Sequence, residues 1–381
     1  MAAAVDPYSL RAEFPILRRQ TYLNNCSLGA LGKRAEARIH EFLGEWRTVG
    51  APSWYETWWG RLEETRKAFA SIVNARSDEV AILPSVSAAL SVLSTAIEDK
   101  DRPATVTSRL DFPTIPYQWM VKRRAKLRFV GRGDGVSVPL DEYAAALGSD
   151  VGAVATSHVL YTTGYIQDAR KICGMAKKAG AVSIIDAYQS VGQLPVDVRA
   201  MGCDVLVAGG LKWLLGGPGC ALVYVKRSRI AEWKPSVTSW FANEHMFQFD
   251  PERFEFRRTA SRFELGTPAL AAVFATLGGM ETVLKAGVAS IRRRQNKLVT
   301  DLYDRLVDAT FGVASPKLEA ERAGILMVRD PEAPATVKRL AKRSIAVDYR
   351  HGKVRVSPYF YNNEGENAKF VQALKTVRKR R

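Results

Sequence analysis

The stretch DAYQSVGQLPVDVRAMGCDVLVAGGLKWLLGGPG, residues 186–219, decides the fold. One apolar run, AVSIID, ends at Asp186, and a second, DVLVAGG, ends just before Lys212. Unbroken apolar runs at this spacing are typical of parallel strands that are buried on both faces of a sheet. Ligands of open α/β sheets bind beyond the carboxyl ends of the strands. We therefore expect Asp186 and Lys212 to face one ligand site.

Strand-like and helix-like segments alternate on both sides of this stretch, which predicts an α/β fold with a mostly parallel central sheet. The helical pattern after Thr267 continues through Ile291 to Leu306, and shorter strand-like runs follow it. This change predicts a smaller α+β domain at the C-terminus. We expect an N-terminal segment (1–20) that packs on the small domain, a large domain (21–265), and a long helix with the small domain (266–381). The expected strands of the large domain are 104–108, 127–130, 151–159, 181–186, 204–210 and 221–225.

The composition is that of an ordinary globular protein, with 47% hydrophobic and 25% charged residues. A chain of 381 residues suits two domains. No apolar run approaches the roughly 18 residues of a membrane span. The N-terminus lacks the basic start and apolar centre of a signal peptide. We expect a cytoplasmic protein with no membrane partner.

The chain is strongly basic, with 56 Lys and Arg against 39 Asp and Glu and a formal charge of +17. Clusters such as KRRAKLR and IRRRQNK would suit a nucleic acid, a solvated surface or an anionic substrate. No recognition helix, RNP motif or zinc finger accompanies them, so nucleic acid is not the expected partner. The four cysteines form no CxxC pair, and no metal site is expected.

A lysine at a strand end is partly desolvated, which lowers its pKa and makes its amine a better nucleophile. Pyridoxal 5′-phosphate requires such an amine and a carboxylate. The amine forms an imine with its aldehyde, and the carboxylate keeps the pyridinium nitrogen protonated. The pair Lys212 and Asp186 fits these two roles, although Asp186 could instead be a helix N-cap.

The stretch also resembles the class V aminotransferase family of fold-type I pyridoxal phosphate enzymes. That family includes cysteine desulfurases, selenocysteine lyases, kynureninases and isopenicillin N epimerase. Further matching segments follow in family order: YLNNCSLG (22–29), SVSAAL (85–90), DFPTIPYQW (111–119), SHVLYTTG (157–164), RFELGTP (262–268) and VRVSPYFYNN (354–363). The resemblance implies that Lys212 forms the Schiff base, that Asp186 pairs with the pyridinium, and that Gln189 donates to the phenolic oxygen unless it is a solvated surface residue.

Val86 and Ser87 open a helix after the turn at Leu83 and Pro84, and its backbone N–H groups and hydroxyl would bind the phosphate of the cofactor. A simple serine N-cap is the alternative and is compatible with this role. The resemblance adds two further residues. Gly266 and Thr267 match a segment that reaches the phosphate of a neighbouring subunit, which implies a homodimer with shared sites. A turn ended by proline is the alternative for these two residues. Phe112 matches the ring-stacking position, where desulfurases carry histidine and kynureninases phenylalanine, or it is a core residue.

Three residues are assigned to the amino-acid substrate. Arg355 matches the arginine that clamps the α-carboxylate, with a surface ion pair as the alternative. Tyr161 stands where desulfurases have asparagine and kynureninase-like members tyrosine, and Asn25 would line the substrate mouth. The resemblance implies that His158 orients the residues of the site without itself contacting the ligand. A hydrogen-bonded core histidine is the alternative.

The reaction is less well defined than the cofactor. We favour cleavage of the substrate side chain at Cβ, as in kynureninases and cysteine or selenocysteine lyases, without a persulfide cysteine. No cysteine follows Cys220, so the small domain lacks the nucleophile of a desulfurase. An aminotransferase or epimerase acting at Cα is the alternative. Leu211 replaces the usual histidine or tyrosine before the lysine, which weakens both named activities. A nucleic-acid-binding protein on a retired enzyme scaffold is a distant alternative.

Overall fold

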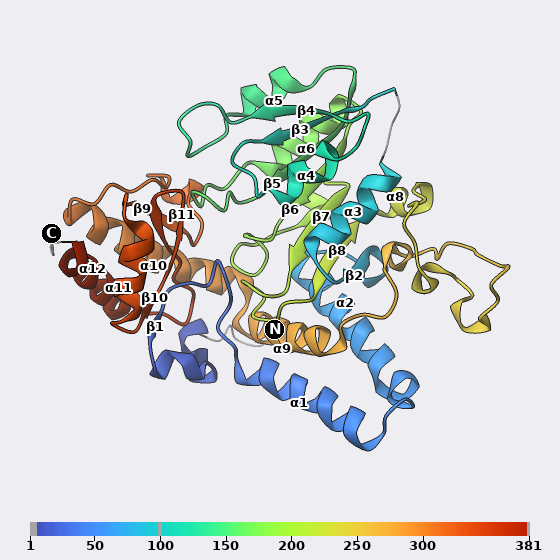
Figure 1. Cartoon of the computed structure of the whole chain (residues 1–381), viewed down its shortest axis with the longest axis horizontal. Helices are drawn as coiled ribbons and strands as arrows, with labels where there is room; N and C mark the ends of the chain where they lie inside the picture. Colours follow the sequence, from blue (N-terminus) through green and yellow to red (C-terminus); the bar gives the residue numbers. More distant parts are fainter. Residues whose placement is uncertain (1–5, 98–100, 379–381) are drawn as a thin grey trace.

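The computed structural model describes residues 6–97 and 101–378 and is built around a seven-stranded sheet (Figure 1). Strand β8 runs antiparallel to both of its neighbours, and the other six strands run parallel to one another. The predicted α/β fold with a mostly parallel sheet is confirmed. In spatial order the strands are β2 (Val80–Leu83), β8 (Ala221–Val225), β7 (Val205–Gly209), β6 (Val182–Asp186), β5 (Val151–Ser157), β3 (Ala104–Ser108) and β4 (Lys126–Val130).

The expected strands agree with the observed ones to within two residues, and most of them are apolar runs that are buried along their whole length. In β7, Leu206 and Ala208 belong to one hydrophobic cluster, while Val205 and Val207 belong to another on the opposite face. Strand β2 was not expected. It is only four residues long and follows a short 3-10 turn (Ser77–Glu79), and no element was assigned to it from the sequence.

Helices cover both faces of the sheet. One face packs against α2 (Trp59–Val73), α6 (Ala169–Lys178) and α9 (Leu270–Ala286), with α1 (Lys33–Thr48) outside α9. The other face packs against α3 (Val86–Ala96), α4 (Thr114–Met120) and α8 (Arg227–Glu232). The short helices α5 (Leu140–Ala146) and α7 (Val198–Met201) complete this part of the chain.

The C-terminal elements lie together at one side of the large sheet (Figure 1). Three antiparallel strands, in the order β11 (Asp348–Arg350), β12 (Lys353–Val356) and β9 (Leu326–Arg329), pack with α10 (Val288–Asp308), α11 (Ala333–Ala341) and α12 (Glu364–Arg378). The N-terminal β1 (Thr21–Tyr22) pairs in parallel with β10 (Ile345–Ala346). The domain boundaries at 20 and 265 stay a prediction, and residues 1–5 lie outside the described part.

The single long helix expected after Thr267 is wrong, because the chain forms two helices, α9 and α10, that meet at 79°. The break falls at Gly287, whose φ of 74° is readily adopted only by glycine. Within the described residues, no single helix is long and apolar enough to cross a membrane. The bent pair α9 and α10 meets the length and composition criteria only when the two are taken together.

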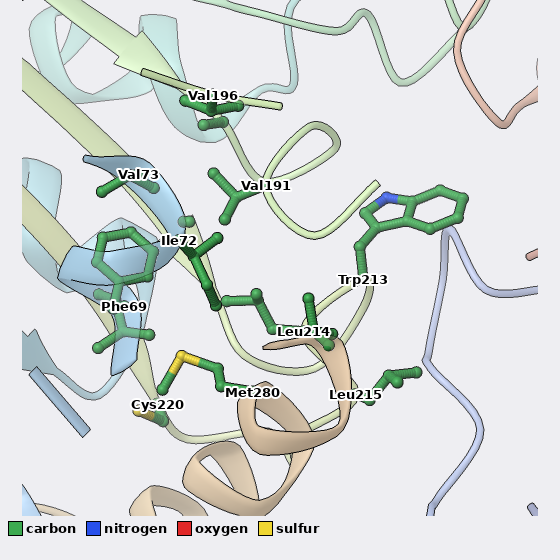
Figure 2. Packing of buried hydrophobic residues seen from close by; sticks show 14 of the residues in the cluster. Phe69, Ile72, Val73, Val191, Val196, Trp213, Leu214, Leu215, Cys220 and Met280 are labelled. Carbon is green, nitrogen blue, oxygen red and sulfur yellow. The ribbon is translucent and has the colours of Figure 1, made fainter. Parts of the chain in front are cut away.

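The loop that follows β7 is fixed against α9 by close packing. Figure 2 shows Trp213, Leu214 and Leu215 along this loop, with Met280 of α9 in the same buried cluster. A Cβ on Gly216 would lie 2.6 Å from Cα of Thr276, and a Cβ on Gly279 would collide with the backbone of residues 214 and 215. Glycines on both sides therefore allow the loop and the helix to touch, which holds Lys212 at the strand end.

Candidate active site

A cavity of about 370 Å³ lies at the carboxyl ends of β5, β6 and β7, between the N-terminus of α3 and the small sheet. Eight predicted site residues line it: Val86, Ser87, Phe112, Tyr161, Asp186, Gln189, Lys212 and Arg355. Asn25, His158, Gly266 and Thr267 are not part of its wall. A second cavity of about 320 Å³ opens at the amino ends of the strands, beside Pro103 and Gly152, away from these residues.

Lys212 follows β7 by three residues and turns its amine toward the cavity. Burial lowers the pKa of the amine to about 8, although the negative charge of Asp186 acts in the opposite direction. The Nζ atom lies 4.2 Å from the ring centre of Tyr188. An amine with this pKa is available as a free base near neutral pH, which suits a nucleophile or a proton carrier.

Asp186 ends β6 and is 7% exposed. Burial raises its pKa to about 6, while the hydrogen bond from the backbone N–H of Tyr188 (2.8 Å) and the charge of Lys212 oppose the rise. Residues 187–190 form a turn and not a helix, so the N-cap alternative is wrong. A cationic ring nitrogen placed beside this carboxylate would restore its charged form.

Gln189 is 4% exposed, so the alternative of a solvated glutamine is wrong. Its Nε2 donates to the carbonyl of Cys26 at 3.0 Å, and its Oε1 accepts from Nε1 of Trp213 at 2.8 Å. These two bonds fix the orientation of the amide and leave its second N–H for a ligand in the cavity.

The N-terminus of α3 presents hydroxyl groups and backbone N–H groups to the cavity. Ser85 is the N-cap, and its hydroxyl accepts from the N–H of Ala88 at 3.1 Å. The hydroxyls of Ser87 and Thr114 lie 2.9 Å apart. Helix N-termini of this kind bind anions. Sequence reasoning missed Ser85 and Thr114, since neither stood out from an ordinary cap or loop residue.

Gly266 and Thr267 lie away from the cavity of their own chain. The N–H of Gly266 donates to Oγ of Ser239 at 2.8 Å, and Thr267 is exposed. Their assignment to the phosphate of a neighbouring subunit stays a prediction.

Phe112 is 45% exposed and lies at the cavity, so it is not a core residue. Its ring meets the ring of Tyr161 edge-on at 5.2 Å. The preceding Asp111 is buried and accepts from the backbone N–H groups of Ser108 and Ser157, both at 2.8 Å. Asp111 thereby ties the ends of β3 and β5 together and sets the position of Phe112. Sequence reasoning missed this carboxylate.

His158 lies behind the cavity wall. Its backbone N–H donates to the carbonyl of Asp186 at 2.8 Å, which links the ends of β5 and β6. Its Nδ1 is buried without a hydrogen-bond partner among the described residues, so a fully hydrogen-bonded core histidine is wrong. Burial lowers its pKa to about 4, which keeps the ring neutral at physiological pH. An orienting role for His158 stays a prediction.

Arg355 is 2% exposed, so the alternative of a surface ion pair is wrong. Its Nη2 donates to Oγ of Ser27 and to Oδ2 of Asp348, both at 2.7 Å. Its Nε is buried and has no partner among the described residues. Arg355 also lines the cavity, and a guanidinium is well suited to bind a ligand carboxylate there.

Asn25 is buried under the cavity instead of lining its mouth. Its Oδ1 accepts from the hydroxyl of Tyr361 at 2.6 Å, and its Nδ2 donates to the carbonyl of Lys212 at 3.4 Å. The next two residues, Cys26 and Ser27, form the wall in its place. The motif pointed to the right loop, but only the fold shows which of its side chains face inward. A direct substrate contact by Asn25 stays a prediction.

The sequence comparisons cover nearly the whole chain. The family model for aminotransferase class V matches residues 44–368. An uncharacterized aminotransferase, YcbU of Bacillus subtilis (strain 168), is 30% identical over 98% of this chain and 99% of its own length. A kynureninase of Geobacillus thermodenitrificans is 28% identical over 96% of this chain and 90% of its own length.

Solved structures share the fold at low sequence identity. An apo cysteine desulfurase from Thermococcus onnurineus NA1 superposes with a TM-score of 0.90 at 22% identity and covers 99% of both chains. The cystine C-S lyase C-DES, in complex with cysteine persulfide, gives a TM-score of 0.88 at 19% identity and covers 95% of this chain and 98% of its own.

Proposed function

Because the chain belongs to the class V aminotransferase family, whose cofactor is pyridoxal 5′-phosphate, we propose that it cleaves the side chain of an amino acid at Cβ. Lys212 would carry the cofactor. One observation supports this assignment most strongly: Asp186 ends β6, Lys212 follows the neighbouring parallel strand β7 by three residues, and both line one cavity. Burial shifts the pKa of each group toward its neutral form, and such shifts are typical of functional sites.

The residues around the pair fit the remaining parts of the cofactor. The N-terminus of α3, with Ser85 and Ser87, offers backbone donors and hydroxyls for a phosphate. Phe112 offers an aromatic face, and Gln189 keeps one N–H for an oxygen of the ring. When bound, the cofactor would supply an electron sink for the bonds at the substrate Cα.

The substrate would be held by its α-carboxylate at Arg355. Arg355 lines the cavity, and its hydrogen bonds to Ser27 and Asp348 fix the guanidinium in place. Lys212, once released from the cofactor, would move a proton at the substrate Cα. Its pKa of about 8 suits that task near neutral pH.

Cleavage at Cβ is favoured by the curated relatives named kynureninase, which match from 91% to 99% of this chain. A persulfide relay is not proposed. Cys26 lies in the cavity wall but is fully buried, and the other three cysteines are buried too. A buried thiol cannot pass sulfur to an acceptor in solution.

An aminotransferase or an epimerase is the second candidate, since the relative from Bacillus subtilis is named an aminotransferase. Leu211 lies beside Lys212 in the wall and offers no acid or base that would separate the reactions. The alternative of a nucleic-acid-binding protein is not favoured, because it gives no reason to bury Lys212, Asp186 and Arg355 around one cavity.

The test is a product assay on the purified holoenzyme, supplied with single amino acids and no keto acid. We expect an amino acid shortened at Cβ to accumulate well beyond one equivalent per site. One equivalent of keto acid, followed by arrest until a second keto acid is added, would identify an aminotransferase. Inversion at Cα without shortening would identify an epimerase.

A further inference from the structure

The small-sheet side of the cavity carries two guanidinium groups, Arg350 and Arg355. Arg350 ends β11, and Arg355 lies on β12 opposite Asp348. Asp348 bridges them: its Oδ1 accepts from Nη1 of Arg350 and its Oδ2 from Nη2 of Arg355, both at 2.7 Å. The α-carboxylate of an amino acid needs only one of these two cations.

The charges of this group do not cancel. Asp348 neutralises one guanidinium, so the three residues together carry one net positive charge. An amino acid with an uncharged side chain is a zwitterion with no net charge. A substrate with a further negative charge complements this wall better than a neutral one does.

Arg350 has N–H donors that are not used by the described residues. Its Nη1 donates to Asp348 and to the carbonyl of Tyr349 (2.6 Å), while no described residue accepts from its Nε or Nη2. The side chain is 39% exposed, whereas that of Arg355 is 3% exposed, so Arg350 stands nearer the solvent end of the cavity. A substrate held by its α-carboxylate at Arg355 would have Arg350 beside it on the side toward the solvent.

Tyr161 marks the same end of the cavity. Its hydroxyl lies 3.3 Å from Nε2 of His351, the residue after Arg350. Burial raises the pKa of Tyr161, and the charges of Arg350 and Arg355 oppose this rise, so both guanidinium groups act on the phenol. An oxyanion bound here would meet a cation with free donors beside a phenol.

We propose that Arg350 determines substrate specificity by binding a carboxylate or other oxyanion at the end of the substrate side chain. The preferred substrates are therefore acidic amino acids. This inference rests on the proposed function, because it requires that the cavity binds an amino acid through Arg355.

The experiment is a binding titration of the holoenzyme, followed by the visible absorption of the bound cofactor. The ligands are aspartate, glutamate and 2-aminoadipate, against asparagine, glutamine and norleucine. We expect at least one acid to bind about tenfold or more tightly than its neutral counterpart. The preference should weaken as the ionic strength rises, because Arg350 is partly exposed.

Arg350→Gln should bring the ratio of acid to amide affinity close to one. Arg128→Gln is the matched control: this side chain is 40% exposed, pairs with Asp150 at 2.7 Å, and lies outside the cavity. It removes the same unit of charge and should keep the ratio. Arg350→Lys should retain part of the preference, because lysine keeps the positive charge but lacks the paired N–H donors of the guanidinium group.

Two results would overturn the inference while leaving the proposed function intact. One is equal binding of acids and amides by the unaltered protein. The other is a uniform loss of affinity in Arg350→Gln with the ratio preserved, which would make Arg350 a support for Asp348 only. If no amino acid changed the absorption of a cofactor that is present, the proposed function itself would fail.

Discussion

At the scale of single residues, burial sets the properties of the site. Lys212 and Asp186 both move toward their neutral forms because a charge in the protein interior loses its hydration. A bound cofactor with a cationic ring nitrogen and an aldehyde would relieve both costs. The same two shifts can be measured in the protein freed of cofactor.

In the cofactor-free protein, Lys212 should react with an amine-specific reagent with a midpoint near pH 8. Exposed lysines titrate near pH 10.4, about two units higher. Burial disfavours the ammonium form and lowers the pKa, so the reactive free amine is populated at lower pH. Mass spectrometry of labelled peptides across a pH series measures the midpoint for each lysine.

The substitution Asp186→Asn tests whether the carboxylate of Asp186 raises the pKa of Lys212. The carboxylate stabilises the ammonium of Lys212, so its removal should lower the midpoint of Lys212 further. Asparagine keeps an oxygen for the N–H of Tyr188, which preserves the turn. An unchanged or raised midpoint would show that the two groups do not interact.

Arg355 should matter for the substrate and not for the cofactor. Arg355→Ala should weaken amino-acid binding by about 100-fold, because a buried, charged donor to a carboxylate is lost. Arg355→Lys keeps the positive charge but not the planar set of guanidinium donors, so amino-acid binding should remain impaired. Cofactor content and substrate affinity are measured on the same samples. Loss of cofactor with intact substrate affinity would contradict this role.

The site residues could be predicted from the sequence where a reactive side chain directly follows an apolar strand. Asp186 and Lys212 stand at the ends of apolar runs, and those runs define the sheet. Ser27 and Arg350 were missed, because Ser27 reaches the cavity from a loop far from Lys212 in sequence and Arg350 from a strand of the small sheet. Their positions depend on tertiary contacts between the N-terminal loop and the strands β11 and β12, which local sequence does not specify.

At the scale of elements, contact between α9 and the loop after β7 positions the lysine. Gly279 lies inside α9, where glycine is normally unfavourable by about 1 kcal/mol relative to alanine. It is tolerated because a Cβ there would collide with the backbone of residues 214 and 215. The helix therefore gives up intrinsic stability so that the loop carrying Lys212 can pack against it.

Gly279→Ala should destabilise the protein by about 2 kcal/mol and weaken cofactor retention, although alanine is the better helix former. Gly60→Ala in α2 is the control, since a Cβ at Gly60 meets no atom within 4 Å. That substitution should stabilise by about 0.5–1 kcal/mol. Thermal unfolding of both variants measures the difference. A stabilised Gly279→Ala would show that the contact is not tight.

The same scale explains what sequence could not predict about the elements. The apolar runs predicted six of the seven strands of the large sheet to within two residues, and β2 was missed. The helical periodicity of 270–306 continued across Gly287, and a glycine within a periodic pattern is compatible with a continuous helix. The bend of 79° depends on the positive φ that Gly287 adopts when α10 packs with the small sheet.

At the scale of the whole molecule, the chain's N-terminal segment joins its C-terminal part to the site. Phe14 is 1% exposed and lies 4.6 Å from the ring of Tyr361. Arg11 pairs with Glu366 of α12 at 3.1 Å. Tyr361 in turn donates to Asn25, which contacts the carbonyl of Lys212. The N-terminal segment is therefore linked to the backbone of Lys212 through Tyr361 and Asn25.

Phe14→Ala should lower the free energy of unfolding by about 3–4 kcal/mol, the usual cost of removing a fully buried phenylalanine. Phe254→Ala, at a position that is 48% exposed, should change it by less than about 1 kcal/mol. Denaturant unfolding of the two variants tests the comparison. Similar small losses would show that the N-terminal segment packs loosely.

The central claim is that Lys212 carries the cofactor, and one measurement tests it directly. The holoenzyme is reduced with borohydride and digested, and the peptide with the reduced cofactor is identified by mass spectrometry. We expect the modification on Lys212 alone, and none in Lys212→Ala. A cofactor linked to another lysine, or a cofactor bound without any linkage, would contradict the account.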